Sequence, residues 1–219
     1  MSSLQRRAEY FAALGDPVRL AIVDELVTSD RTPGELMAMT GLSSPLLTHH
    51  LDILDAAGVV VRTVSHHDRR KRFVRLVPAA RPMHEPVRVP RGAVLFVCTA
   101  NSARSQLAAA LWTELTGGAA DSAGTEPAER VHPMAVRAAD AFGVDIADNR
   151  PRAIRRGELR RATVITVCDQ AHDEIAVSSH RWHWSIPDPA ADGTRRAFDA
   201  VVGELRTRIA PFVDGLDKH

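Results

Sequence analysis

A proline-rich span near the middle of the chain most strongly limits what this sequence can fold into. Residues 77–92, VPAARPMHEPVRVPRG, contain four prolines. That density excludes a continuous helix or a central strand, so we expect an extended, semi-rigid linker. At 219 residues the chain can form two small domains that each bury a core without disulfides. We therefore predict domains over residues 1–77 and 93–219, joined by a linker over 78–92.

The segment before the linker shows helical patterns with clear ends. Asp16, followed by proline, is a capping residue ahead of a helix over residues 17–27. Its expected apolar face consists of Leu20, Val23, Leu26 and Val27. Thr32 and Glu35 form a capping box for a second short helix, which Gly41 ends.

A third helix and a hairpin complete the expected N-terminal domain. From Ser43 to Gly58 the residues Leu47, Leu51 and Leu54 recur at helical spacing. The short turn between this helix and the preceding one makes the pair a helix-turn-helix candidate. The alternating segments at residues 59–65 and 72–78 then predict a hairpin. Helices followed by a hairpin predict a winged helix-turn-helix domain.

A winged helix-turn-helix reads DNA with the second helix of the motif, whose first residues face base edges in the major groove. The residues in those positions here are Ser43, Ser44, Thr48 and His49. The hairpin tip carries a basic run suited to phosphate contacts, made of Arg69, Arg70, Lys71 and Arg72. A solvated hairpin tip can carry the same charges, but the position after the helix-turn-helix favours DNA contact. Double-stranded DNA is therefore an expected partner.

This half of the chain resembles the arsenic-repressor family of winged-helix regulators over about residues 5–77. The most specific piece is LTHHLDILDAAGVV, residues 47–60. The resemblance implies a homodimeric transcriptional regulator. That family's arsenite sensors place a cysteine cluster near the start of the helix before the recognition helix, but residues 24–36 contain no cysteine. Since residues 1–77 contain none at all, this domain cannot bind arsenite through thiolates. Four histidines of this half, His49, His50, His66 and His67, form no set with carboxylates at the spacing of metal ligands, so we expect no metal site.

The sequence after the linker alternates between strands and helices. The expected strands are residues 93–97, 119–124 and 162–168, and the expected helices are residues 102–115, 133–143 and 195–216. Such alternation predicts a parallel sheet covered by helices, so the C-terminal domain should be of the α/β class.

Residues 98–105, CTANSARS, form a Cys-x5-Arg-Ser sequence between a buried strand and a helix. A tight loop there turns backbone N–H groups toward one point, and the helix dipole adds positive potential. Arg104 supplies a planar, two-pronged donor for a tetrahedral oxyanion, and the same field favours a thiolate at Cys98. The expected anion-binding residues are Thr99, Ala100, Asn101, Ser102, Ala103, Arg104 and Ser105. A cysteine that only ends a buried strand would not explain Asn101, Arg104 and Ser105 arriving together.

A general acid for the leaving oxygen is available at Asp188, in the segment WSIPDPAADGT. Together these segments resemble the low-molecular-weight protein tyrosine phosphatase fold, and within it the arsenate reductases, over about residues 92–216. The resemblance implies that Cys98 is the nucleophile, Arg104 the oxyanion binder and Asp188 the acid. Tyrosine phosphatases of this group place aromatic residues after the Asp-Pro, where Ala190 and Ala191 stand here. Arsenate, or phosphate as its close analogue, is therefore the expected oxyanion.

The second cysteine, Cys168, is at the end of the expected strand 162–168. It stands where the thioredoxin-linked relatives keep their second cysteine, but their third cysteine is Ile175 here. Either Cys98 and Cys168 pair and an external reductant opens the disulfide, or a small thiol attacks the arsenate adduct directly. Plain buried packing is the other interpretation of Cys168. We expect no bound cofactor, and an external thiol from thioredoxin, a glutaredoxin-type protein or a small molecule.

The N-terminus has no apolar signal core, and the chain lacks an apolar run of about eighteen residues. We therefore expect a soluble cytoplasmic protein without a membrane partner, which suits free thiols. Our leading hypothesis is a bifunctional arsenate reductase and DNA-binding regulator of the arsenic response. The alternatives are a regulator whose C-terminal domain senses arsenate or phosphate without turnover, and a protein tyrosine phosphatase.

Overall fold

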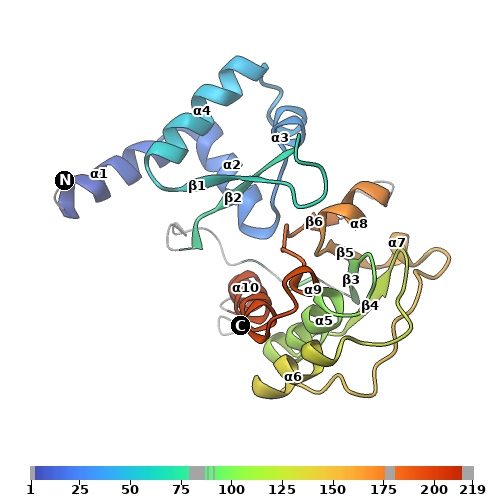
Figure 1. The fold of residues 1–219 in the computed structure, drawn as a ribbon. Coiled ribbons are helices and arrows are strands. Elements are labelled where there is room, and N and C mark those ends of the chain that lie inside the picture. Colours follow the sequence, from blue (N-terminus) through green and yellow to red (C-terminus); the bar gives the residue numbers. More distant parts are fainter. Residues whose placement is uncertain (1–2, 79–86, 88, 91, 176–180, 214–219) are drawn as a thin grey trace. The chain divides into compact units, whose positions relative to one another are not determined.

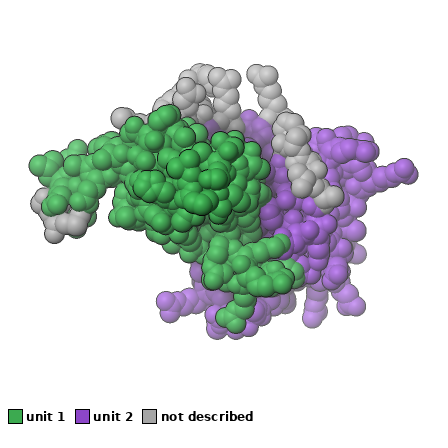
Figure 2. Space-filling view, turned by 90° about the horizontal axis from the view of Figure 1, so that it is seen from above, with its two compact units in different colours: residues 1–85 green, residues 86–219 purple. Residues whose placement is uncertain are grey.

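The computed structural model describes residues 3–78, 87, 89, 90, 92–175 and 181–213. The chain divides into two compact units, residues 1–85 and 86–219, shown in different colours in Figure 2. The dividing position falls within the proline-rich span, most of which lies outside the described residues. None of the described helices is long and apolar enough to cross a membrane.

The N-terminal unit contains helices followed by a hairpin, which confirms the predicted winged helix-turn-helix (Figure 1). Its elements are α1 (Ser3–Leu14), α2 (Pro17–Thr28), α3 (Pro33–Thr40), α4 (Ser44–Ala56), β1 (Val60–Val64) and β2 (Arg72–Leu76). The strands β1 and β2 pair antiparallel, with Val60 opposite Leu76 and Val64 opposite Arg72. Arg31 adds an isolated bridge to Val74 of β2, which ties the α2–α3 connection to the hairpin.

The helix ends follow the predicted capping residues. The Asp16 carboxylate accepts hydrogen bonds from the first-turn N–H groups of Val18 and Arg19, at 2.9 and 3.0 Å. The Thr32–Glu35 capping box is present in both directions. Gly41 ends α3 in the left-handed conformation, with φ 71°. These caps satisfy N–H and carbonyl groups that a helix leaves without internal partners.

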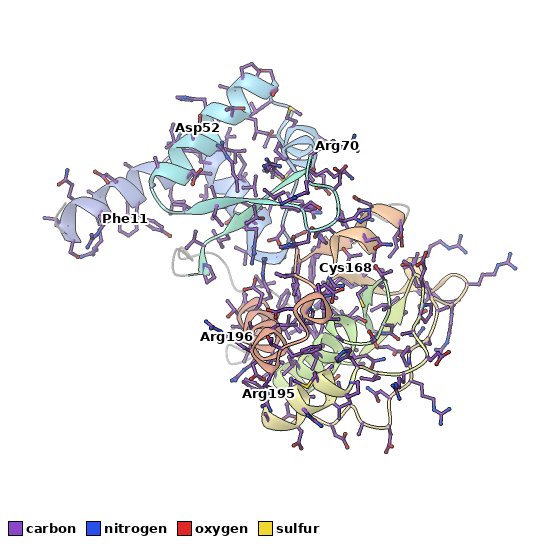
Figure 3. All side chains as sticks on the ribbon, viewed as in Figure 1. Phe11, Asp52, Arg70, Cys168, Arg195 and Arg196 are labelled. Atoms are coloured by element: carbon purple, nitrogen blue, oxygen red, sulfur yellow. The ribbon has the colours of Figure 1, made fainter. Side chains whose placement is uncertain are left out.

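Two features of this unit differ from the sequence expectation. Leu20, expected on the apolar face of α2, is 41% exposed, and Ile22 is buried instead. The buried face consists of Ile22, Val23, Leu26 and Val27, and Leu20 falls at its edge. Helix α1 was not expected, and Ala13 is its one buried residue. Phe11, labelled on α1 in Figure 3, is 57% exposed.

The C-terminal unit is built around a four-stranded parallel sheet of order β4-β3-β5-β6, as predicted for this α/β unit. Its strands are β3 (Val94–Cys98), β4 (Ala120–Gly124), β5 (Thr163–Thr166) and β6 (Arg181–His183). Its helices are α5 (Arg104–Thr116), α6 (Pro133–Ala141), α7 (Glu158–Arg161), α8 (Asp169–Glu174), α9 (Pro189–Asp192) and α10 (Arg195–Val213). Helix α5 packs on β3 and β4, α10 packs on α5 and α6, and α8 packs on β3 and β5.

Strand β3 is buried at every residue because it is an inner strand covered by helices. Phe96 packs between Trp112 and Trp184, with ring centroids 5.7 Å from each. Trp112 in turn contacts Phe212 of α10, at 4.8 Å. This aromatic core fixes β3, and Cys98 is its last residue. Binding sites of parallel sheets lie at this carboxyl edge.

Candidate active site

The loop between β3 and α5 is held from outside through its carbonyl groups. Four of its carbonyl oxygens accept backbone N–H bonds of 2.8–3.2 Å from residues 125–132; they belong to Cys98, Thr99, Ala100 and Ser102. In a trans peptide the carbonyl and the next N–H point in opposite directions, so the following N–H groups face the inside of the loop. These inward donors belong to Thr99, Ala100, Asn101 and Ala103. Convergent N–H groups at a helix N-terminus form an anion-binding concavity.

The sulfur of Cys98 lies inside this concavity with two polar neighbours. The Asn101 N–H donates to Sγ at 3.2 Å, and Ser105 Oγ lies 3.0 Å from Sγ. Cys98 is buried and makes no disulfide. The strand, the loop and the first turn of α5 therefore place one thiol among hydrogen-bond donors.

Asn101 fixes the conformation of the loop. Among the described residues it is the one non-glycine residue with a positive φ, 48°. Its amide Nδ2 donates to Ser105 at 2.8 Å and to Ser122 of β4 at 2.9 Å. Its Oδ1 accepts the N–H of Arg152 at 2.9 Å, and its carbonyl accepts Gln106 Nε2 at 3.1 Å. Every polar group of this side chain is used, so the strained backbone is fixed from several sides.

The sequence did not predict the residues outside the anion loop that hydrogen-bond to Asn101 or hold its partners in place. Gln106 is buried and accepts a hydrogen bond from Asn149 Nδ2 at 3.0 Å. Together with Ser122 and Arg152, they line a cavity of about 460 Å³ whose lining does not include Cys98 or Arg104. Gln106 adjoins the motif and could have been found from it. Asn149 lies 43 residues further on, so no local spacing links it to the loop.

Gly124, the last residue of β4, is required by the close approach of this loop. A Cβ added there would lie 2.5 Å from the Thr99 carbonyl oxygen and 3.1 Å from the Asn101 nitrogen. Both contacts are with backbone, which cannot move aside without displacing the loop.

We predict that Gly124→Ala lowers the free energy of unfolding of the C-terminal unit by about 1–3 kcal/mol, the usual cost of overpacking. Chemical denaturation followed by tryptophan fluorescence measures it, because all three tryptophans lie in that unit. The matched control is Gly203→Ala in α10, where an added Cβ meets nothing within 4 Å. The control should gain up to about 1 kcal/mol from helix propensity. Unchanged stability of Gly124→Ala would show that the loop is not tightly placed.

Arg104 and Asp188 meet at the mouth of the loop. Arg104 Nη2 lies 3.1 Å from the Asp188 carboxylate, and Nη1 donates to the Ile186 carbonyl at 3.1 Å. Asp188 also caps α9 by accepting the Ala190 N–H at 3.1 Å, while its side chain stays 49% exposed. A guanidinium has five N–H donors, so three remain for an anion. The structure thus brings a basic fork and a carboxylate together from distant segments.

Cys168 lies close to the same loop, at the start of α8 (Figure 3). Its Sγ is 3.4 Å from Thr99 Oγ1 and accepts the Ala171 N–H at 3.4 Å. Burial raises the pKa of this thiol, an effect that the nearby Arg104 guanidinium opposes. At neutral pH Cys168 is therefore held as the neutral thiol.

A buried polar cluster begins at Asp169, the residue that follows Cys168. His183 Nε2 lies 3.0 Å from the Asp169 carboxylate, and His183 Nδ1 lies 2.9 Å from Thr166 Oγ1. The His172 ring stacks on His183 with centroids 4.1 Å apart. The sequence offered no partner for His183, because its neighbours come from β5 and α8. No group of three or more His, Cys, Asp or Glu side chains in the described ranges is arranged to hold a metal ion.

The candidate DNA-reading residues of the N-terminal unit lie at the start of α4. Ser43, Ser44, Thr48 and His49 are all exposed, whereas Leu47 and Leu51 are buried. Thr48 Oγ1 donates to the Ser44 carbonyl at 2.9 Å, so its donor is occupied within the helix. The helix therefore shows one polar surface and one core-facing surface.

The basic residues of the hairpin tip are also exposed, but they are not all without partners. Arg70, labelled in Figure 3, makes two hydrogen bonds to the Asp68 carboxylate, at 3.0 and 2.9 Å. These bonds lower the pKa of Asp68 to about 2. Arg72 Nη1 donates to the Arg69 carbonyl at 2.8 Å. Arg70 thus carries a counter-charge that a DNA phosphate would have to displace.

Comparison with known proteins identifies both parts of the chain. Residues 93–219 match the low molecular weight phosphotyrosine protein phosphatase family, and residues 16–61 match the bacterial regulatory protein, arsR family. Arsenate reductase of Brevibacillus brevis is 36% identical over 128 residues, which span 55% of this chain and 93% of the relative. Arsenate reductase of Halalkalibacterium halodurans is 36% identical over 132 residues, 55% of this chain and 94% of the relative.

A solved structure, the YwlE arginine phosphatase from Geobacillus stearothermophilus, superimposes with a TM-score of 0.51 at 26% identity. The match covers 57% of this chain and 92% of that structure. Through residues 93–219 the chain belongs to the low molecular weight phosphotyrosine protein phosphatase family, and it carries an arsR-family helix-turn-helix at residues 16–61.

Proposed function

We propose that the chain is a thiol-dependent arsenate reductase joined to a DNA-binding regulator of the arsenic response. The observation that carries the first half is the position of Cys98 within a loop whose N–H groups face inward beside Arg104. The curated relatives named arsenate reductase, which align over nearly their whole length, support arsenate as the oxyanion.

The proposed reaction begins when the loop N–H groups and the free donors of Arg104 bind arsenate. The Cys98 thiolate attacks arsenic and forms a sulfur–arsenic bond, while one arsenate oxygen leaves as water after accepting a proton from Asp188. A second thiolate then attacks Cys98 Sγ. The sulfur–arsenic bond breaks, its electron pair reduces arsenic from the +5 to the +3 state, and a disulfide forms. Arsenate and two thiols thus give arsenite, water and one disulfide.

The second thiol is either Cys168 or an external thiol. Cys168 is near enough to the loop to contact Thr99, which supports the intramolecular route. Its raised pKa means that few molecules hold the thiolate at neutral pH. An external reductant, from thioredoxin, a glutaredoxin-type protein or a small thiol, then restores the pair.

For the intramolecular route we predict that reduced wild-type protein without external thiol releases about one arsenite per chain, and that Cys168→Ser releases none. The wild-type rate should rise with pH through the neutral range, about tenfold per pH unit while Cys168 is mostly protonated. Rapid-quench arsenite analysis measures both results. Cys168→Ala separates loss of the thiol from the polarity of serine. If the wild type also released no arsenite without external thiol, and both variants matched its rate once an external thiol was added, the second step would belong to the external thiol.

We propose that the N-terminal unit supplies the regulatory half as a homodimer on double-stranded DNA. The exposed residues at the start of α4 would read base edges, and the hairpin tip would contact phosphates. This unit has no cysteine, so a thiolate arsenite sensor of the kind found in its relatives is absent from it.

The experiment that tests the proposal combines purified protein with arsenate and one reducing system at a time. Arsenite formation above a no-protein control, with thioredoxin, glutaredoxin or a small thiol, is the expected result. Saturable arsenate binding that shifts DNA affinity without arsenite would favour the sensor instead. Aryl phosphate hydrolysis well above a Cys98→Ser control, with no arsenite formed, would favour a phosphatase.

A further inference from the structure

Apart from Arg152, whose N–H supports Asn101, the arginines of one arginine-rich segment of the C-terminal unit have no part in the proposed reaction. Between residues 150 and 161 the chain holds six arginines and one carboxylate, Glu158. The arginines are Arg150, Arg152, Arg155, Arg156, Arg160 and Arg161. The segment ends in α7, and the charge balance over the whole chain is close to neutral, so this cluster is local.

One of these arginines fixes the segment in place. Arg152 Nη2 lies 2.6 Å from the Asp121 carboxylate and 2.7 Å from the Glu158 carboxylate. Glu158 also accepts the Arg155 N–H at 2.8 Å, which closes the turn before α7. The only carboxylate of the segment therefore holds the segment together, through its contacts with Arg152 and the Arg155 N–H.

The remaining arginines are exposed, and the one carboxylate of the segment, Glu158, interacts with Arg152 and with the nearby Arg155. Two of them converge. Arg160 Nη2 and Arg161 Nη2 each lie 3.6 Å from the point where a Cβ would stand on Gly157, which has φ 76°. Arg161 is held there by donating to the Arg156 carbonyl at 3.3 Å. Two like charges at one point repel each other until an anion neutralises them, and guanidinium forks match phosphate oxygens.

The surroundings of this cluster favour a nucleic-acid backbone over a protein partner. Protein interfaces are built around an apolar or aromatic centre. Among the described residues, none of the exposed large hydrophobic side chains lies between 150 and 161. Protein–DNA interfaces are more polar and much more positive, and at least half of their hydrogen bonds go to phosphates and sugars.

We infer that Arg155, Arg156, Arg160 and Arg161 form a second DNA-contacting surface that binds backbone phosphates without reading sequence. This surface lies on the C-terminal unit, and it goes beyond the reading of DNA proposed for the N-terminal unit. It adds to affinity and to the salt dependence of binding, since each phosphate contact releases condensed counterions.

The test uses the full chain and a fluorescein-labelled duplex of random sequence, with fluorescence anisotropy measured over a series of KCl concentrations. The variant replaces all four arginines by glutamine. We expect the slope of log affinity against log salt to become shallower by about 0.9 for each phosphate that is no longer neutralised, and affinity at low salt to fall at least tenfold. The matched control removes the same charge from exposed arginines elsewhere on this unit, by changing Arg130, Arg137, Arg195 and Arg196 to glutamine.

Arsenite formation with a small thiol shows that both variants are folded. Equal slopes for the variant and the control would overturn the inference, as would failure of the wild type to bind the duplex at low salt. Loss of turnover with a protein reductant only, while turnover with the small thiol and the DNA slope are kept, would assign the surface to an acidic protein and also overturn it.

Discussion

Replacing Cys98 by serine is expected to lower arsenite formation by at least about 1,000-fold, the scale on which loss of a nucleophile acts. Serine keeps the size of the side chain and its hydrogen bonds to Asn101 and Ser105. It cannot form the sulfur–arsenic bond or the disulfide through which electrons reach arsenic. No other group in the loop has this chemistry.

The same variant should still bind oxyanion, since the loop N–H groups and Arg104 are unchanged. Isothermal titration with arsenate and with phosphate measures binding, and tryptophan fluorescence checks the fold. Arsenite formation by Cys98→Ser at more than a tenth of the wild-type rate would exclude Cys98 as the reacting thiol.

Replacing Arg104 is expected to have the next largest effect. Arg104→Ala should reduce kcat/KM for arsenate by about 100- to 1,000-fold, and Arg104→Lys by about 100-fold. Arg104 touches both the Ile186 carbonyl and Asp188 while keeping donors for the anion, and a single ammonium cannot serve all three. Weaker oxyanion binding should accompany the loss.

Steady-state kinetics across arsenate concentrations measures this effect. Arg130→Ala and Arg130→Lys, at an exposed arginine outside the loop, are the matched controls. If Arg104→Lys kept wild-type kcat/KM, Arg104 would be a structural partner of Asp188 and not an oxyanion binder.

The long elements could be predicted from sequence because each carries its own local signal. The run over β3 is apolar at every position, and α3 begins and ends at residues whose side chains or backbone form caps. Four short elements that the sequence did not predict, β6, α7, α8 and α9, span three to six residues each, too few for periodicity to show. Helix α1 has twelve residues, a length at which an isolated helix is marginal, and only Ala13 of it is buried, so neither length nor a wide apolar face marked it in the sequence.

For the site, the motif supplied the groups that touch the anion but not the groups that hold the loop. Cys98, Arg104 and Ser105 lie within eight residues, so their spacing was visible. Asn101 hydrogen-bonds to Ser122 and Arg152, which are distant in sequence, and His183 of β6 pairs with Asp169 of α8. Such contacts depend on strand order and register, which a single sequence does not encode in any local pattern.

The two halves differ in their sulfur chemistry. The only cysteines of the chain are Cys98 and Cys168, both in residues 86–219. Any thiol-based response to arsenic must therefore take place in the C-terminal unit, and the DNA-binding unit can respond only through it or through another chemistry.

The most direct test of the central proposal is the number of arsenite molecules released per chain. Reduced wild-type protein is mixed with excess arsenate and, in separate reactions, with thioredoxin, glutaredoxin or a small thiol, and arsenic species are separated and quantified over time. The proposal predicts many equivalents of arsenite per chain with at least one reductant, and none above background for Cys98→Ser. Saturable arsenate binding with no arsenite under any reductant would contradict it.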